Sequence, residues 1–183
     1  VDDTEQVNSL WGENAPTQGG LSALEMITKA KSGELKALLV YRSNPAVDFP
    51  GGAQVVEALK NLDLLVVHDM LETETTQLAK IVLPSNGPGL DEGTTTNIGG
   101  RVQSRRKSLD TNHIADWKLI SLMLKELGDE TDYSRAAKVL DEISKKVPGY
   151  EEINFRGVGK FGLNREKVSC EEVSIGKASV DSA

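Results

Sequence analysis

Residues 64–69 read LLVVHD, a run of four apolar residues that ends in two polar ones. Two further runs have a similar form: residues 36–41 read KALLVY, and residues 81–84 read IVLP. A short, continuous apolar run is typical of a strand that is buried on both faces of a parallel sheet. Helical patterns separate the three runs, which predicts parallel strands joined by right-handed helical crossovers.

The predicted helices have recognisable starts. Ser22 and Glu25 have the spacing of a capping box, in which each residue satisfies a free backbone amide of the other. Further helices are predicted over residues 53–62 and 74–80, the second with Thr73 as its N-cap. The predicted fold class is therefore α/β: a doubly wound, parallel, Rossmann-like sheet with helices on both faces.

The sequence pattern changes after the third apolar run. Residues 93–97 and 101–103 predict a short extended excursion around a glycine turn. Asp116 is expected to cap a helix over residues 117–127, and another helix is predicted over residues 134–146. Four apolar side chains of the first of these helices are expected to face the core: Trp117, Ile120, Met123 and Leu124.

Length and composition narrow the class of protein. The 183 residues predict one α/β domain over residues 1–163, followed by a flexible tail over residues 164–183. A net charge of −7 argues against nucleic-acid binding, which needs a basic patch or stripe. No stretch has the apolar length of a membrane span and no signal-peptide pattern opens the chain, so we expect a cytoplasmic protein without direct membrane insertion. The polar start at Val1 suggests a piece of a larger subunit.

The sequence offers little for metal binding. Cys170 is the only cysteine, so the chain alone can build neither a disulfide nor a thiolate-held zinc or iron–sulfur site. The two histidines, His68 and His113, are far apart in sequence and have no ligand pattern around them. We expect no metal site.

Ligands of an open parallel sheet bind beyond the carboxyl ends of its strands. Arg42 offers a fork that matches phosphate, and the Asp69 carboxylate suits a ribose or the amino edge of guanine. The candidate cofactor-binding residues at this edge are Arg42, Ser43, Asn44, Pro45, His68, Asp69, Thr73, Glu74 and Ser85.

Simpler roles remain open for most of these residues. Asn44 and Pro45 form a turn initiator, and Thr73 is explained by helix capping. Glu74 in a first helical turn complements the helix dipole, and a histidine at a strand end is usually a hydrogen-bonded edge residue. The basic run Arg101, Arg105, Arg106 and Lys107 favours a solvated hairpin over an anion site.

Four strings of this sequence carry a family resemblance. Residues 64–75 read LLVVHDMLETET, residues 78–85 LAKIVLPS, residues 92–97 EGTTTN and residues 100–103 GRVQ. In their order and spacing, across roughly residues 20–128, they resemble the molybdopterin oxidoreductase superfamily. That family typically shows a strand followed by an aspartate, then Thr-Glu-Thr-Ala, Ala-Asp-Val-Val-Leu-Pro, Glu-Gly-Thr-x-x-Asn and Gly-Arg-Val-Gln.

The sequence departs from the family pattern at two positions. Arg42 stands where the family usually has glycine before Asn-Pro, and Lys80 stands where it usually has aspartate. Both departures favour the branch without molybdenum, which is the large iron–sulfur (G-type) subunit of NADH:quinone oxidoreductase (complex I). The alternative is the part of a formate dehydrogenase alpha subunit that binds molybdopterin guanine dinucleotide.

The resemblance implies a scaffold role in electron transfer from NADH to quinone. The chain would contact other subunits of a redox complex, in the peripheral arm of a membrane-bound assembly. The iron–sulfur clusters of either branch belong to an amino-terminal part that this sequence lacks. We therefore expect no cofactor in the chain itself, no catalytic residue and no turnover by the chain alone, although it would be part of an oxidoreductase.

Overall fold

The computed structural model describes residues 19–129 and 133–165. Most of the loop predicted at the start of the chain lies outside the described residues. The same is true of the predicted tail from residue 166 on, including Cys170.

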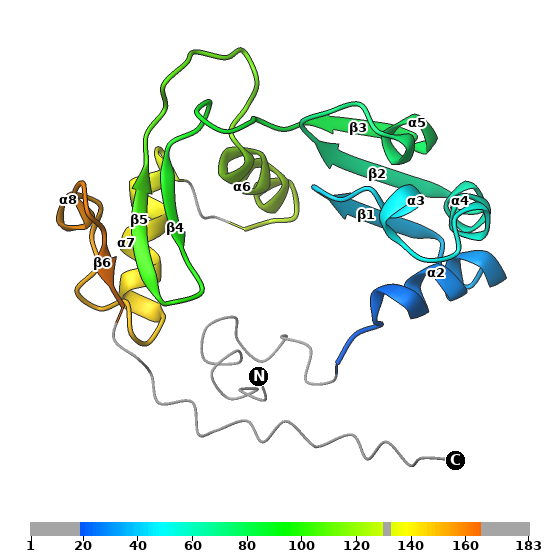
Figure 1. Ribbon diagram of the computed structural model, residues 1–183, viewed down its shortest axis with the longest axis horizontal. Helices are drawn as coiled ribbons and strands as arrows, with labels where there is room; N and C mark the ends of the chain where they lie inside the picture. Colours follow the sequence, from blue (N-terminus) through cyan, green and yellow to red (C-terminus); the bar gives the residue numbers. More distant parts are fainter. Residues whose placement is uncertain (1–18, 130–132, 166–183) are drawn as a thin grey trace. The chain divides into compact units, whose positions relative to one another are not determined.

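The chain forms two compact units (Figure 1). Unit 1 combines residues 1–92 with residues 106–133, and unit 2 combines residues 93–105 with residues 134–183. Each unit has its own three-stranded sheet and its own buried apolar cluster.

Unit 1 contains the predicted parallel sheet. Its strands are β1 (Ala37–Tyr41), β2 (Leu64–Asp69) and β3 (Ile81–Pro84), in the order β1-β2-β3. The register places His68 of β2 opposite Tyr41 of β1 and Leu83 of β3. The predicted α/β class with a parallel sheet is confirmed, and the carboxyl ends of the three strands meet at one edge.

Local sequence signals explain the helices of unit 1. They are α2 (Ala23–Ser32), α3 (Pro45–Asp48), α4 (Ala53–Lys60), α5 (Glu74–Leu78) and α6 (Asp116–Glu126). The capping box is confirmed, because the Ser22 hydroxyl accepts from the Glu25 amide while a Glu25 carboxylate oxygen accepts from the Ser22 amide. Thr73 caps α5 as predicted. The short helix α3 was not predicted; it begins with Pro45, whose fixed φ suits a first helical position.

The main core of unit 1 lies on one face of the sheet. Ala30 of α2 and Leu59 of α4 pack there with Val40 of β1 and with Leu65 and Val67 of β2. The strand order advances in one direction, so both right-handed crossovers put their helices on this same face.

The opposite face of the sheet is largely open. Leu39 and Tyr41 of β1 are 50% and 40% exposed, and Ile81 of β3 is 47% exposed. The expectation that the strands are buried on both faces is therefore wrong for β1 and β3. Both are edge strands of a sheet with three members, and only β2 has a neighbour on each side.

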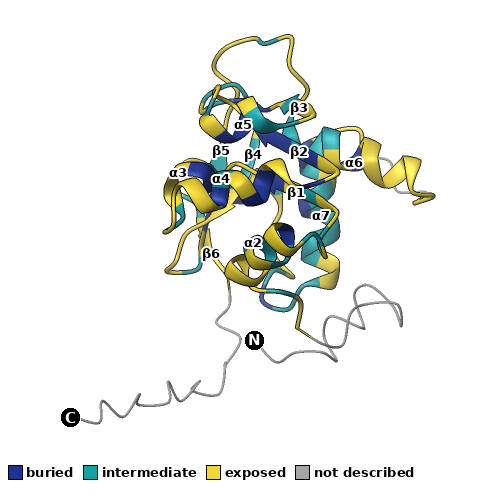
Figure 2. Cartoon of the chain, turned by 90° about the vertical axis from the view of Figure 1, so that its right-hand side faces the viewer, coloured by how far each residue is buried: buried dark blue, intermediate teal, exposed yellow. Residues whose placement is uncertain are grey.

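Helix α6 differs from its prediction in two ways. Its N-cap is Ala115, which has no capping side chain, and Asp116 is the first helical residue. Ile120, Met123 and Leu124 are exposed, so their expected burial is wrong (Figure 2). The physical reason is that α6 lies beyond the carboxyl ends of the strands and meets them with its first turn, not with its apolar side (Figure 1).

Unit 2 confirms the predicted hairpin. Strands β4 (Gly93–Thr96) and β5 (Arg101–Arg105) pair antiparallel, and the two-residue strand β6 (Leu163–Asn164) pairs with β5. Helices α7 (Ala136–Lys146) and α8 (Phe155–Val158) complete the unit. Its core consists of Val102, Leu140, Ile153 and Val158. Strand β6 and helix α8 are too short to show a sequence period, and neither was predicted.

The described helices are short. The longest, α6 and α7, have 11 residues each. Within residues 19–129 and 133–165, no helix combines the length and the apolar character needed to cross a membrane.

The one-sided core predicts which leucines stabilise unit 1. Leu59 is 1% exposed, and we expect Leu59→Ala to lower the free energy of unfolding of unit 1 by about 2–5 kcal/mol, because the lost burial leaves a cavity. Leu24→Ala, at an exposed position of helix α2, serves as the control and should change it by less than about 0.5 kcal/mol, since Leu24 is 61% exposed. Denaturant unfolding followed by amide hydrogen exchange in β1 and β2 measures both. Equal effects of the two substitutions would contradict this assignment of the core.

Candidate functional site

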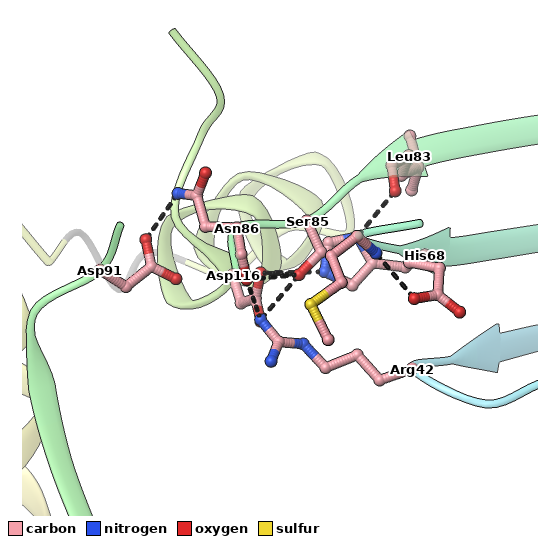
Figure 3. Close-up of polar contacts among 9 residues, drawn as sticks. Arg42, His68, Leu83, Ser85, Asn86, Asp91 and Asp116 are labelled. Carbon is pink, nitrogen blue, oxygen red and sulfur yellow. Dashed lines mark hydrogen bonds and ion pairs between the residues drawn. The ribbon is translucent and has the colours of Figure 1, made fainter. Parts of the chain in front are cut away.

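A polar cluster lies at the carboxyl ends of the strands of unit 1, with Asp116 at its centre (Figure 3). Oδ1 of Asp116 accepts a hydrogen bond from the Ser85 hydroxyl at 2.7 Å and lies 3.1 Å from Nε2 of His68. Oδ2 of Asp116 lies 2.5 Å from a guanidinium nitrogen of Arg42. One carboxylate at the start of α6 therefore contacts residues that follow or end all three strands. We call Arg42, His68, Ser85 and Asp116 the strand-end cluster.

Arg42 reaches the cluster from an unusual backbone conformation. Its φ is +47°, and it is the one residue other than glycine with positive φ among the described residues. Its amide donates to the His68 carbonyl at 2.8 Å and so extends the β1–β2 ladder by one bond. Its guanidinium also donates to the Ser85 hydroxyl at 2.7 Å and to the Asn86 carbonyl at 2.8 Å. The partly exposed side chain is therefore held by several internal partners.

His68 is 1% exposed and has both ring nitrogens in use. Nδ1 lies 3.1 Å from the Leu83 carbonyl oxygen, and Nε2 lies 3.1 Å from the Asp116 carboxylate. Both partners are acceptors, so each contact is a hydrogen bond when that ring nitrogen carries a proton. The Tyr41 ring lies against the imidazole, with a centroid distance of 4.4 Å. His68 is thus a buried residue with an internal partner beside each ring nitrogen.

The pKa values of Asp116 and of the neighbouring Tyr41 are both shifted. Burial alone would raise the pKa of Asp116, but the hydrogen bond from Ser85, the charge of Arg42 and the contact with His68 outweigh it, so the pKa lies below its usual value. Burial and the nearby Asp116 carboxylate both raise the pKa of the Tyr41 hydroxyl. The ionised form of Asp116 is therefore the stabilised form.

A buried amide–carboxylate pair adjoins the cluster. Nδ2 of Asn86 donates to Oδ1 of Asp91 at 2.5 Å, and both side chains are buried. Oδ1 of Asn86 is buried without a hydrogen-bond partner among the described residues. The backbone carbonyl of Asn86 accepts from Arg42, which links this pair to the strand-end cluster.

A second group of polar residues joins the start of α3 to the start of α5. Nδ2 of Asn44 donates to the Glu74 carboxylate at 2.8 Å, and Oδ1 of Asn44 accepts from the Thr75 hydroxyl at 2.7 Å. The Thr75 hydroxyl in turn accepts from the Ala46 amide. The hydrogen bond from Asn44 lowers the pKa of Glu74. Both ends of the Asn44 amide are therefore occupied by internal partners.

A pocket of about 340 Å³ lies beside β3 and α5. Asp69, Met70, Gln77, Val82 and Pro84 are among the residues that line it. One carboxylate oxygen of Asp69 accepts from the Met70 amide at 2.7 Å. Asp69 is thus the candidate residue that combines a carboxylate with an adjacent open space.

The nine candidate residues fall into separate groups. Arg42, His68 and Ser85 meet in the strand-end cluster, while Asn44 and Glu74 meet at the second group. Thr73 caps α5, Pro45 begins α3, Asp69 lines the pocket and Ser43 lies in the exposed turn after β1. The central residue, Asp116, was predicted only as a helix cap. An acidic residue at a helix start is fully explained by the helix dipole, so the sequence held no signal that could reveal its contacts.

Metal binding has no support in the described part of the chain. Among residues 19–129 and 133–165, no three side chains of histidine, cysteine, aspartate or glutamate lie together in a way that could hold an ion.

Known proteins share this sequence pattern. The family model for molybdopterin oxidoreductase matches residues 4–126. F420-dependent formate dehydrogenase 1 subunit alpha of Methanococcus maripaludis is 33% identical over 172 residues, which cover 92% of this chain and 25% of that protein. A G-type subunit of the NADH-quinone oxidoreductase of Rhizobium meliloti is 30% identical over 157 residues, which cover 83% of this chain and 18% of that protein. The chain thus spans a quarter or less of the length of these relatives.

A solved structure shows the same fold. Acetylene hydratase from Pelobacter acetylenicus aligns with a TM-score of 0.64 at 16% sequence identity, over 78% of this chain and 20% of that chain. Homologues include both a formate dehydrogenase alpha subunit and a G-type subunit of NADH-quinone oxidoreductase, the two branches that the sequence resembles. The chain belongs to the molybdopterin oxidoreductase family.

Proposed function

We propose that this chain is a cofactor-free scaffold module of the large iron–sulfur (G-type) subunit of NADH:quinone oxidoreductase. The observation that carries the proposal is the position of Arg42. Its guanidinium lies beyond the end of β1 and contacts Asp116, Ser85 and the Asn86 carbonyl. The family usually has glycine at this turn, where a bare backbone can approach a pyrophosphate closely.

The residues at the carboxyl ends of the three strands do not fit a pterin nucleotide. A pyrophosphate needs free donors and positive charge, whereas the Arg42 charge is already paired with Asp116. Asn44 uses both ends of its amide internally, and the Ser85 hydroxyl is also occupied. The carboxylates of Asp69, the last residue of β2, and of Glu74, the first residue of α5, would repel phosphate.

The scaffold role extends to the whole chain. Under this proposal the chain contacts other subunits of a redox complex, in the peripheral arm of a membrane-bound assembly. Electron transfer is then left to iron–sulfur clusters elsewhere in the parent subunit.

The expectation of one domain over residues 1–163 stays a prediction. The family match covers residues 4–126, which takes in the sheet of unit 1 and the β4–β5 hairpin.

A second candidate function is supported by a different observation. Asp69 lines the 340 Å³ pocket, and a carboxylate can accept from the amino edge of guanine. The chain is also 33% identical to a formate dehydrogenase alpha subunit. The alternative is therefore a module that binds molybdopterin guanine dinucleotide in a formate dehydrogenase.

Nucleotide titration separates the two candidates. We expect guanosine diphosphate, which carries the guanine and pyrophosphate of that cofactor, to show no saturable binding to the wild-type chain in calorimetry, because Arg42 occupies the turn. Arg42→Gly removes the guanidinium and restores the family residue at a position with positive φ. If the strand-end cluster blocks a nucleotide site, this variant should bind more tightly than the wild type.

The matched control is Arg106→Gly, which removes an exposed arginine of unit 1 outside the cluster. It should bind no better than the wild type. Tight binding by the wild type that Arg42→Gly weakens would make Arg42 a phosphate ligand, and the formate dehydrogenase function would replace the scaffold proposal.

The strand-end cluster also predicts a pH dependence of the stability of unit 1. The pKa of Asp116 is lowered in the folded protein, so its contribution is complete above the ordinary aspartate value of 3.8 and is lost as the pH falls through that value towards the folded pKa. We expect Asp116→Asn to reduce the pH dependence of the unfolding free energy below about pH 5. Denaturant unfolding at a series of pH values measures this. Asp110→Asn, which removes a fully exposed carboxylate, is the control and should leave the slope unchanged. An unchanged slope in Asp116→Asn would contradict the central role of this carboxylate.

A further inference from the structure

The sheet of unit 2 has one covered face and one open face, and β5 alternates between them. Val102 is 1% exposed and packs in the core with Leu140. Arg101, Gln103 and Arg105 are exposed. Because side chains alternate along a strand, these three lie on the open face at intervals of about 7 Å.

The neighbouring strands add no negative charge to this face. Thr95 of β4 is opposite Gln103, and Asn164 of β6 is opposite Arg101. Gly93 is opposite Arg105. The described open face therefore presents two arginines among uncharged groups that can form hydrogen bonds.

The two arginines keep most of their donors free. Nε of Arg101 donates to the Phe161 carbonyl at 2.8 Å, and this bond fixes the base of the side chain. Neither arginine forms an ion pair with a carboxylate among the described residues, and Arg105 has no hydrogen bond from its side chain there. A free guanidinium has a planar fork that matches a carboxylate.

The chain that flanks β5 is packed tightly enough to hold the face in place. Gly162 has a φ of +77°, and a Cβ there would meet the Val102 carbonyl oxygen at 2.6 Å and Cγ of Gln103 at 3.0 Å. Only glycine allows this close approach beside Arg101 and Gln103. Close packing therefore fixes the backbone of residue 162 beside the side chains of Arg101 and Gln103.

Charge is distributed unevenly between the units. By sequence, unit 2 has eleven lysines and arginines and eight aspartates and glutamates, whereas unit 1 has ten and twenty. Unit 2 is therefore a basic part of an acidic chain, and its field attracts a partner of opposite sign.

We propose that the open face of the unit 2 sheet, built on Arg101, Gln103 and Arg105, is a docking surface for an acidic protein surface. This face has no aromatic side chain on β4, β5 or β6 on which a base could stack, and the described pocket belongs to unit 1. Arginines spaced along a strand suit carboxylates on a facing protein. The proposal goes beyond the scaffold function and does not depend on the state of the strand-end cluster.

Binding of poly-L-glutamate to the full chain tests the proposal. We expect salt-dependent binding that is readily measured at about 0.02 M salt and largely lost at about 0.3 M, where exposed charges are screened. R101Q/R105Q should weaken binding and raise the dissociation constant by about tenfold. R105Q alone should give a smaller loss in the same direction. It has no internal partner to disturb among the described residues, so it remains informative if the double variant fails to fold.

The matched control removes two exposed lysines of unit 1 in the variant K60Q/K125Q, which has the same change in net charge. This variant should bind poly-L-glutamate as the wild type does. The proposal is overturned if the wild type does not bind, if the control weakens binding as much as R101Q/R105Q, or if single-stranded oligothymidylate binds this face as tightly as poly-L-glutamate.

Discussion

The carboxylate of Asp116 is the contact on which the arrangement of unit 1 beyond its sheet depends. It receives Arg42 from the end of β1, contacts His68 at the end of β2 and accepts from Ser85 just after β3. Helix α6 has few other buried residues, since Ser121 is its one buried side chain. Polar contacts at a single residue thus hold this helix to the strand ends.

This dependence follows from how the sheet is covered. Parallel sheets normally bury both faces, but the crossovers of unit 1 place their helices on the face of Val40 and Val67. The other face leaves Leu39 and Ile81 exposed. Apolar burial therefore secures one side of the sheet, and a charged network with fixed geometry secures the strand ends. The two kinds of stabilisation act on different parts of one unit.

The parts of the structure that the sequence predicts are those with local causes. The capping box at Ser22, the cap at Thr73 and the three apolar strands each depend on residues a few positions apart, and all were confirmed. The contacts of Asp116 join residues far apart in the chain, which no period or motif encodes. The exposure of Ile120 was missed for the same reason, because an amphipathic pattern shows which side of a helix is apolar but not whether anything covers it.

The positive φ of Arg42 couples this residue to Asp116, which lies far from it in the sequence. Glycine fits this backbone without strain, so the arginine is retained at a conformational cost that its internal contacts offset. A change at position 42 alone leaves Asp116 short of its cation, and a change at position 116 alone leaves a strained arginine without its anion. Substitutions at positions 42 and 116 are therefore expected to have non-additive effects on the stability of unit 1.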